Sequence, residues 1–74
     1  MNDIGWSVQQ MRDGKQVRRA GWNGKGMYLY LDTGHGTTLI YEPCVVMFTA
    51  QAKHQPGWVC SQADLLATDW EIAD

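Results

Sequence analysis

The first apolar residues of the chain recur at helical spacing. Ile4, Val8 and Met11 are separated by four and three residues, so they share one face of a helix predicted over residues 3–12. At 100° per residue, Trp6 falls far from this face. We therefore expect Trp6 on the outer side of the helix. A subunit interface or the wall of a ligand site is favoured there over simple exposure to solvent.

Side chains that can cap a helix mark the start of two helices. Asp3 or Asn2 can accept a hydrogen bond from the free amides of the first helix. Further along, the spacing Ser61-x-x-Asp64 fits a capping box, in which the hydroxyl and the carboxylate satisfy free amides of the first turn. A short second helix is therefore predicted over residues 61–67.

Alternating apolar side chains predict a central strand in the middle of the chain. This strand runs from Met27 to Leu31, with Met27, Leu29 and Leu31 pointing one way and Tyr28 and Tyr30 the other. Both of its faces are apolar or aromatic. A strand of this kind lies in the centre of a sheet or is covered on both sides.

Weaker patterns complete the expected sheet. Turn residues at 32–36 predict a hairpin that joins the central strand to a second strand over residues 37–41. Residues 50–57 are polar and irregular, so we expect a surface loop there. Further strands or extended segments are expected at residues 15–20, 44–49, 58–60 and 70–72. The predicted class is α+β: one domain over residues 1–74, with a small, mainly antiparallel sheet, an N-terminal helix and a short C-terminal helix.

The composition indicates a small domain that associates with copies of itself. A domain of this length buries only about 60% of its unfolded surface and is marginally stable alone. Four Trp and three Tyr are a heavy aromatic load for 74 residues, and these side chains are favoured at interfaces and ligand pockets. We therefore expect a homo-oligomer. The net charge of -2 argues against broad DNA or RNA binding, which depends on a basic face.

The chain shows no signal for export, membrane insertion or metal binding. Residues 1–5 have neither a basic region nor an apolar stretch, and no segment approaches the roughly 20 apolar residues of a membrane span. We expect a cytoplasmic protein in which Cys44 and Cys60 stay reduced. Metal-ligand spacings such as Cys-x-x-Cys are absent, so neither a metal nor a cofactor is expected.

The run Gly21-Trp22-Asn23-Gly24-Lys25-Gly26, here called the glycine corner, combines three glycines with an indole, an amide and an ammonium group. Glycine tolerates positive φ and lets another molecule approach the backbone closely. The three side chains offer stacking, hydrogen bonds to a base or ribose, and a partner for phosphate. A nucleotide-like ligand would use all three. The run also fits a tight turn whose Trp22 packs in the core, and the motif alone favours that interpretation.

The start of the predicted helix 61–67 is a second candidate binding element. Free amides and the positive end of the helix dipole attract anions there. Trp58 lies close to this helix in the sequence, and stacking a base on an aromatic ring contributes about 1–3 kcal/mol. If this element meets the glycine corner, two rings and two phosphate sites would suit a cyclic dinucleotide or a cyclic ADP-ribose-like molecule.

Known enzyme motifs do not match the chain. The glycine corner lacks the Gly-Lys-Ser/Thr ending of a P-loop, and a strand rather than a helix follows it. Ser61 has no nucleophile-elbow context and is explained as a helix cap. Asp64 and Asp69 could bind Mg²⁺ as a pair, but no third ligand accompanies them. Non-catalytic binding is therefore favoured, with a small phosphodiesterase and a protein-binding module as the alternatives.

Over nearly its whole length the chain resembles the Thoeris anti-defence protein two family of small phage proteins. The resemblance begins with a short N-terminal helix ending at Gly14 and continues through the block from Gly21 to Leu29, which contains the glycine corner. Pro43 and Met47 match in the middle of the chain. The resemblance closes with the pattern Trp58-x-x-Ser61-Gln62-x-Asp64-Leu65-Leu66-Ala67-x-Asp69-Trp70.

The resemblance implies a non-enzymatic protein, encoded by a phage or prophage, that acts in the host cytoplasm. Proteins of this family bind the cyclic ADP-ribose signal of the Thoeris defence enzyme and hold it without cleaving it, so the effector is never activated. Some members also hold cyclic dinucleotides in separate pockets. The implied assembly is a homotetramer whose pockets are shared between subunits.

By residue type, the expected ligand contacts fall into three groups. Rings would stack on or wall the ligand, polar side chains would bind base or ribose edges, and cations with backbone amides would meet phosphates. The rings are Trp22, Trp58, Tyr28 and Trp6; the polar side chains are Asn23, Gln62 and Asp64; and the phosphate contacts are Lys25, Arg18 and the backbone near Gly24 and Gly26. Ser61, at the start of the second helix, completes the set.

Overall fold

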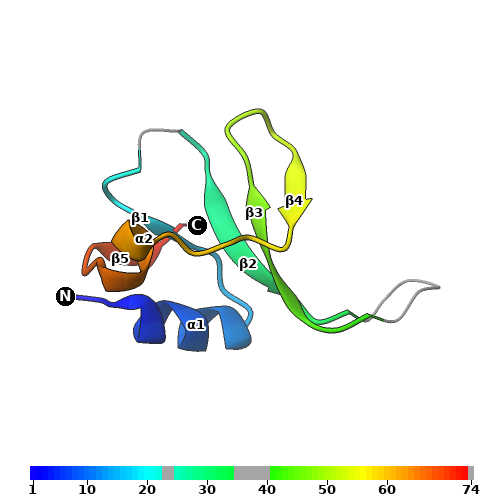
Figure 1. The fold of residues 1–74 in the computed structure, drawn as a ribbon, viewed down its shortest axis with the longest axis horizontal. Helices are drawn as coiled ribbons and strands as arrows, with labels where there is room; N and C mark the ends of the chain where they lie inside the picture. The colour runs from blue at the N-terminus through cyan, green and yellow to red at the C-terminus, as the bar shows by residue number, and fades with distance from the viewer. Residues whose placement is uncertain (23–24, 35–40, 74) are drawn as a thin grey trace.

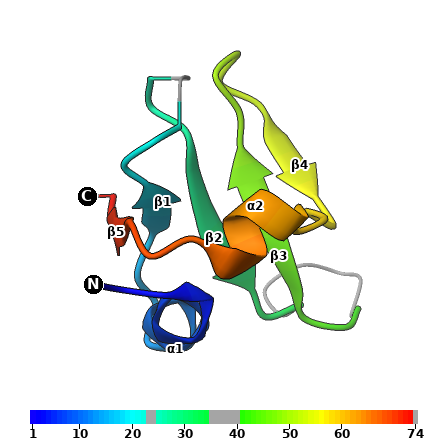
Figure 2. The same ribbon diagram turned by 60° about the vertical axis from the view of Figure 1, so that its left-hand side comes forward.

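Among the described residues, five antiparallel strands form one sheet in the order β4-β3-β2-β1-β5, with two helices packed beside it (Figures 1 and 2). The computed structural model describes residues 1–22, 25–34 and 41–73. The elements are α1 (Ile4–Arg12), β1 (Val17–Arg19), β2 (Tyr28–Asp32), β3 (Cys44–Phe48), β4 (His54–Pro56), α2 (Gln62–Leu66) and β5 (Trp70–Ile72). The predicted α+β class with an antiparallel sheet is confirmed.

Strand β2 lies at the centre of the sheet, as its sequence predicts. Tyr28 is opposite Phe48 and Leu29 is opposite Met47 on the β3 side, while Val17 of β1 faces Leu29 on the other side. Leu29 is fully buried, and Tyr28 stacks on Phe48 with the ring centroids 4.9 Å apart. Side chains on both faces of β2 therefore make packing contacts.

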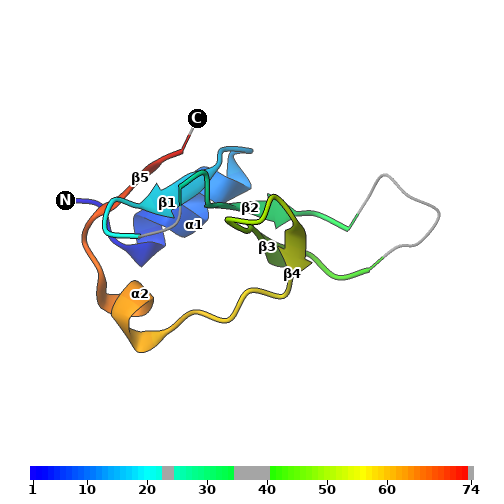
Figure 3. The same ribbon diagram turned by 90° about the horizontal axis from the view of Figure 1, so that it is seen from above.

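The core lies between α1 and one face of the sheet. Met11 of α1, Val17 of β1, Leu29 of β2 and Trp70 of β5 form a buried cluster, and α1 contacts all three of these strands. After β4, the chain runs past β3 and β2 to reach α2 (Figures 1 and 3). Along this path Trp58 packs against the buried cluster, so the crossing segment and α1 cover the same core.

Helix α1 confirms the predicted helix but corrects its buried face. Asp3 is the N-cap and accepts a hydrogen bond from the amide of Trp6 at 2.9 Å. Ser7 is fully buried and its hydroxyl donates to the carbonyl of Asp3, whereas Val8, on the predicted apolar face, is 37% exposed. Trp6 packs against the core instead of standing on an outer face. Helix α1 contacts α2 as well as the sheet, so more than one stripe of the helix is covered.

The expectation of a loop over residues 50–57 is wrong, because β4 lies within it. His54–Pro56 pairs with β3, placing Pro56 opposite Val46. All three residues of β4 are exposed, so no alternation of apolar and polar positions marks this strand in the sequence. Proline is tolerated because an edge strand needs hydrogen-bonding partners on one side only.

Residues 58–60, expected to be a brief extended segment, belong to no strand of the sheet. Of the strand expected at 37–41, residues 37–40 lie outside the described residues, and Tyr41 belongs to no strand. The antiparallel partner that follows β2 is β3, so the connection between the paired strands is longer than the predicted tight hairpin.

The sheet face opposite Leu29 carries four ring side chains that contact one another, here called the outer aromatic face: Tyr28, Tyr30, Phe48 and His54. The rings of Tyr30 and Phe48 meet the His54 ring edge-on, with centroids 5.8 and 5.0 Å away. The Tyr30 hydroxyl lies 2.8 Å from Nδ1 of His54. These contacts connect the edge strand β4 to the central strand β2 across β3.

Position 34 requires glycine for two separate reasons. The φ angle of Gly34 is +80°, and a Cβ there would overlap the carbonyl of Tyr41. We expect Gly34→Ala to lower the free energy of unfolding by more than about 1 kcal/mol, the typical cost of forcing a side chain into this region. Gly14→Ala is the matched control, since its φ is +85° but a Cβ meets open space. Urea denaturation measures both; equal losses would mean that the overlap with Tyr41 adds no cost.

Candidate functional site

The glycine corner begins two residues after the end of β1. Hydrogen bonds to Asp69, the residue before β5, hold the chain at its start in place. The amide of Trp22 donates to the carbonyl of Arg19 at 3.2 Å, and the amide of Ala20 donates to the carbonyl of Asp69 at 3.0 Å. The amide of Gly21 donates to Oδ2 of Asp69 at 2.9 Å. A Cβ on Gly21 would lie 2.9 Å from this same oxygen. Glycine at this position therefore allows the carboxylate to reach the backbone.

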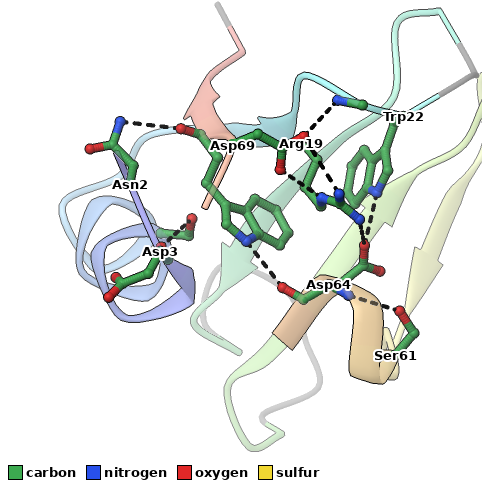
Figure 4. Close-up of polar contacts among 10 residues, drawn as sticks. Asn2, Asp3, Arg19, Trp22, Ser61, Asp64 and Asp69 are labelled. Atoms are coloured by element: carbon green, nitrogen blue, oxygen red, sulfur yellow. Dashed lines mark hydrogen bonds and ion pairs between the residues drawn. The ribbon is translucent and has the colours of Figure 1, made fainter. Parts of the chain in front are cut away.

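The second candidate element, the start of α2, has the predicted Ser61 cap, but Asp64 does not complete the predicted capping box, because its carboxylate accepts from Arg19 and Trp22 instead of a first-turn amide. Ser61 is the N-cap, and its Oγ accepts a hydrogen bond from the amide of Asp64 at 3.1 Å. This amide is thus satisfied inside the helix, rather than being left for an anion. The carboxylate of Asp64 points away from the helix toward β1 and the glycine corner (Figure 4).

The two elements meet at Asp64. Nε1 of Trp22 donates to Oδ1 of Asp64 at 3.1 Å, and Nη1 of Arg19 donates to the same oxygen at 2.8 Å (Figure 4). Nε1 of Trp70 donates to the Asp64 carbonyl at 3.2 Å. The indoles of Trp22 and Trp70 meet edge-on, with ring centroids 5.5 Å apart and planes at 77°. One aspartate therefore connects the glycine corner, the short helix and the core.

Arg19 lies between two carboxylates, and we call Arg19, Asp64 and Asp69 the carboxylate clamp. Nε of Arg19 donates to Oδ1 of Asp69 at 2.8 Å, while Nη2 lies 3.5 Å from Oδ2. Arg19 is the main cause that lowers the pKa of Asp69. Partial burial alone would raise the pKa of Asp64, but hydrogen bonds from Arg19 and Trp22 outweigh it and lower that pKa. The clamp therefore stays charged at neutral pH.

A surface pocket of about 390 Å³ lies against the clamp. Its lining consists of Arg18, Arg19, Ala20, Trp22, Lys25, Gly26, Met27 and Glu71. Arg18 pairs with Glu71 across β1 and β5, with Nε and Oε2 2.8 Å apart. Lys25 is exposed and forms no ion pair with another residue in the described ranges. The pocket is thus lined by an indole-bearing residue, one lysine and two arginines whose guanidinium groups are already paired with carboxylates.

The comparisons with known proteins agree with the resemblance seen in the sequence. A family model described as the Thoeris anti-defense 2-like domain matches residues 2–73. A curated protein named Thoeris anti-defense 2, from Bacillus phage SP01, is 39% identical over 81 aligned positions, covering 93% of this chain and 91% of the relative. The chain belongs to the Thoeris anti-defense 2 family. Membership of this family supports a phage anti-defence role.

In this member of the family, the pocket brings together four of the expected ligand contacts. These are Arg18, Trp22, Lys25 and Gly26. Asp64 is connected to the pocket through its hydrogen bonds to Trp22 and Arg19. Asn23 and Gly24, the other expected contacts of the glycine corner, lie outside the described residues.

The remaining expected contacts lie outside the lining of this pocket. Trp58 meets Trp70 edge-on, with ring centroids 6.3 Å apart. Tyr28 belongs to the outer aromatic face, and Trp6 packs on the core. Ser61 caps α2, and Gln62 is its first, exposed residue. Packing or capping contacts therefore account for the positions of all but Gln62.

The sequence suggests only one role for Asp69, as a possible Mg²⁺ ligand together with Asp64. It gives no sign that Asp69 contacts the glycine corner. In the structure the guanidinium of Arg19 occupies the space between Asp64 and Asp69. Nowhere in the described ranges do three His, Cys, Asp or Glu side chains gather closely enough for a metal ion. The pairing of Arg19 with Trp70 brings Asp69 beside β1, and this register cannot be inferred before the sheet is known.

No helix among the described residues has the length and apolar character needed to cross a membrane.

Acid is expected to weaken the clamp. The pKa values of Asp64 and Asp69 are lowered below the usual value of about 3.9, so both carboxylates stabilise the fold when ionised. This stabilisation is complete above the unfolded-state pKa and is lost as the pH falls through the lowered values. We expect the urea midpoint to fall between about pH 5 and pH 2 more steeply in the wild type than in the double variant Asp64→Asn/Asp69→Asn. Parallel profiles would contradict this role of the clamp.

Proposed function

We propose that this chain binds and sequesters a cyclic ADP-ribose-type immune signal without cleaving it, and so prevents activation of the defence effector. Cyclic dinucleotides of related defence systems are the second ligand class that we propose. The observation that carries this proposal is the pocket beside the clamp, which Trp22, Lys25 and Gly26 line together.

Each lining group suits one part of such a ligand. The Trp22 ring would stack on a base, which contributes about 1–3 kcal/mol. Lys25 would pair with a phosphate, and Arg18 would join it from its position beside Glu71. Gly26 has a φ of +78° and open space around its Cβ position, so a ligand can approach the backbone closely there.

A pocket of this size can provide the affinity that a signal-sequestering protein needs. To compete with an effector, the dissociation constant should be nanomolar, which corresponds to about -12 kcal/mol. For a ligand of roughly forty heavy atoms this is about 0.3 kcal/mol per atom, an ordinary ligand efficiency. Burial and pre-organisation suffice for such binding, so no catalytic group is required.

The chemistry of the clamp favours storage over cleavage. A general base works best when its pKa lies near the working pH. The pKa values of Asp64 and Asp69 are shifted the other way, and both carboxylates already accept hydrogen bonds from Arg19. Neither carboxylate is therefore suited to activating a water molecule against the ligand.

We further propose that the protein works as a homo-oligomer, with a tetramer as the expected form. The pocket of about 390 Å³ is near the small end of the range of roughly 300–1,000 Å³ for ligand sites. A second subunit closing over it would bury more of the ligand. The outer aromatic face, with half-buried Tyr28, Tyr30 and Phe48, supports self-association because aromatic side chains are enriched at interfaces.

Native mass spectrometry with a panel of cyclic ADP-ribose isomers and cyclic dinucleotides tests this function. We expect a tetramer carrying bound ligand mass, and chromatography after heat denaturation of the complex should recover the ligand intact. Fragments in the released fraction would contradict storage and favour the phosphodiesterase alternative. No bound mass with any compound of the panel would favour the protein-binding module.

A further inference from the structure

Arg19 lines the pocket, but its hydrogen-bonding capacity is directed into the protein. Its Nε and Nη2 approach Asp69, and its Nη1 donates to Asp64. The Arg19 side chain is only 22% exposed, and the Asp64 side chain 14%. A guanidinium held by two carboxylates attracts a phosphate much less than an unpaired one, because its charge is already balanced. A role other than ligand binding must therefore explain why Arg19 lies beside the pocket.

The Trp22 indole is held by the same network. Its Nε1 donates to Oδ1 of Asp64, and its ring rests edge-on against buried Trp70. The backbone just before it is fixed by the bond from Gly21 to Asp69. Two carboxylates from the segment around α2 and β5 thus fix both the backbone and the side chain that form one wall of the pocket.

We infer that Asp64 and Asp69 are positioning residues, which act through Arg19 and the glycine corner to hold the Trp22 indole in place as a preformed wall of the pocket. An indole that is ordered before the ligand arrives lowers the entropic cost of binding. Arg19 is then a structural cation, and the phosphates are left to Lys25 and Arg18. The effect of the clamp on affinity rests on the proposed function, whereas its effect on the indole does not.

The two aspartates accept hydrogen bonds through different sets of oxygens. Asparagine variants at the two positions should therefore have different effects. Both donors to the Asp64 carboxylate, from Arg19 and Trp22, converge on the single oxygen Oδ1. Asp69 uses both oxygens, Oδ1 for Arg19 and Oδ2 for Gly21. Asparagine keeps only one acceptor oxygen. Asp64→Asn can therefore preserve its contacts, whereas Asp69→Asn must set an NH₂ group against a donor.

The indole N–H signal of Trp22 in a ¹H–¹⁵N correlation spectrum reports the clamp directly, and Trp22→Phe assigns it. We expect Asp64→Ala and Asp69→Asn to move this signal strongly, and Asp64→Asn to leave it near its wild-type position. Arg19→Lys should also move it, because one ammonium group cannot reproduce the fork that spans both carboxylates. Asp13→Asn, an exposed aspartate at the end of α1, is the control and should change nothing.

Affinity for the tightest-binding compound of the panel is measured on the same variants by calorimetry. Asp64→Ala, Asp69→Asn and Arg19→Lys should each weaken binding about tenfold or more, as expected when a hydrogen bond to a charged group is lost. Asp64→Asn should weaken it less than about threefold. Equal effects of the two asparagine variants, or an unchanged indole signal in Asp64→Ala and Arg19→Lys, would overturn the positioning role.

The experiments distinguish a failure of the proposed ligand binding from a failure of the positioning role of the clamp. If the wild type binds no compound of the panel, the proposed function fails, and the indole signals still decide the positioning role. If Asp64→Ala or Asp69→Asn unfolds and its spectrum collapses, Arg19→Lys and Asp64→Asn still test the positioning role. The indole signal and the ligand affinity are then compared between these two variants. A displaced indole with unchanged affinity would mean that the clamp orders Trp22 without serving the ligand site, and would overturn the link to binding.

Discussion

Replacement of Trp70 by alanine is expected to lower the free energy of unfolding by about 3–5 kcal/mol, the usual cost of removing a buried indole. The side chain is 2% exposed and contacts both Trp22 and Trp58 edge-on. Its Nε1 also donates to the carbonyl of Asp64. Domains are stable by only about 5–15 kcal/mol, and small ones lie near the lower limit, so much of this variant should be unfolded.

Trp70→Phe separates packing from hydrogen bonding. Phenylalanine keeps a ring between Trp22 and Trp58 but leaves the carbonyl of Asp64 without the indole donor, so we expect a smaller loss, about 1–3 kcal/mol. Urea denaturation followed by circular dichroism measures both variants. A loss below about 1 kcal/mol for Trp70→Ala would contradict the position of this residue in the core.

Trp22→Ala is expected to produce the largest loss of ligand affinity. Removing the stacking surface should weaken binding by about 1–3 kcal/mol, or roughly 5- to 150-fold. The fold and the oligomer should persist, because the Trp22 side chain is half-buried and its edge contact with Trp70 contributes only about 0.5–1.5 kcal/mol. Calorimetry with the tightest-binding compound of the panel measures the affinity, and native mass spectrometry checks the assembly.

Trp22→Phe is the matched variant, since it keeps a ring in the pocket but cannot donate to Asp64. We expect its affinity to lie between those of the wild type and Trp22→Ala. If Trp22→Ala binds as tightly as the wild type, the ring is no part of the ligand site. If the variant unfolds, Trp22 acts as a core residue, which is the alternative that its sequence context leaves open.

The sequence predicts those elements whose local chemistry is strong. The spacing of Ile4 and Met11 predicts α1, the alternation around Leu29 predicts the central strand, and Ser61 marks the start of α2. In each case the signal lies within one element. The same spacing places Val8 on the face of Ile4 and Met11, but Val8 is 37% exposed, which the spacing alone does not reveal.

What the sequence does not reveal depends on long-range pairing. Strand β4 carries no apolar pattern because it is an exposed edge, and only its pairing with β3 identifies it. The contacts of Arg19 with Asp64 and Asp69 span 45 and 50 residues. They exist because β5 pairs with β1 and places Asp69 beside the glycine corner. The residue types in the pocket could be predicted, but the carboxylate network behind them could not.

We place the ligand in the pocket that the glycine corner forms with β1 and β5. A ¹H–¹⁵N correlation titration of the wild-type protein with the tightest-binding cyclic nucleotide tests this most directly. We expect the largest shift changes at the Trp22 indole and at the amides of Lys25 and Gly26. Changes confined to Tyr30, Phe48 and His54 on the outer aromatic face, with the Trp22 indole unmoved, would contradict it.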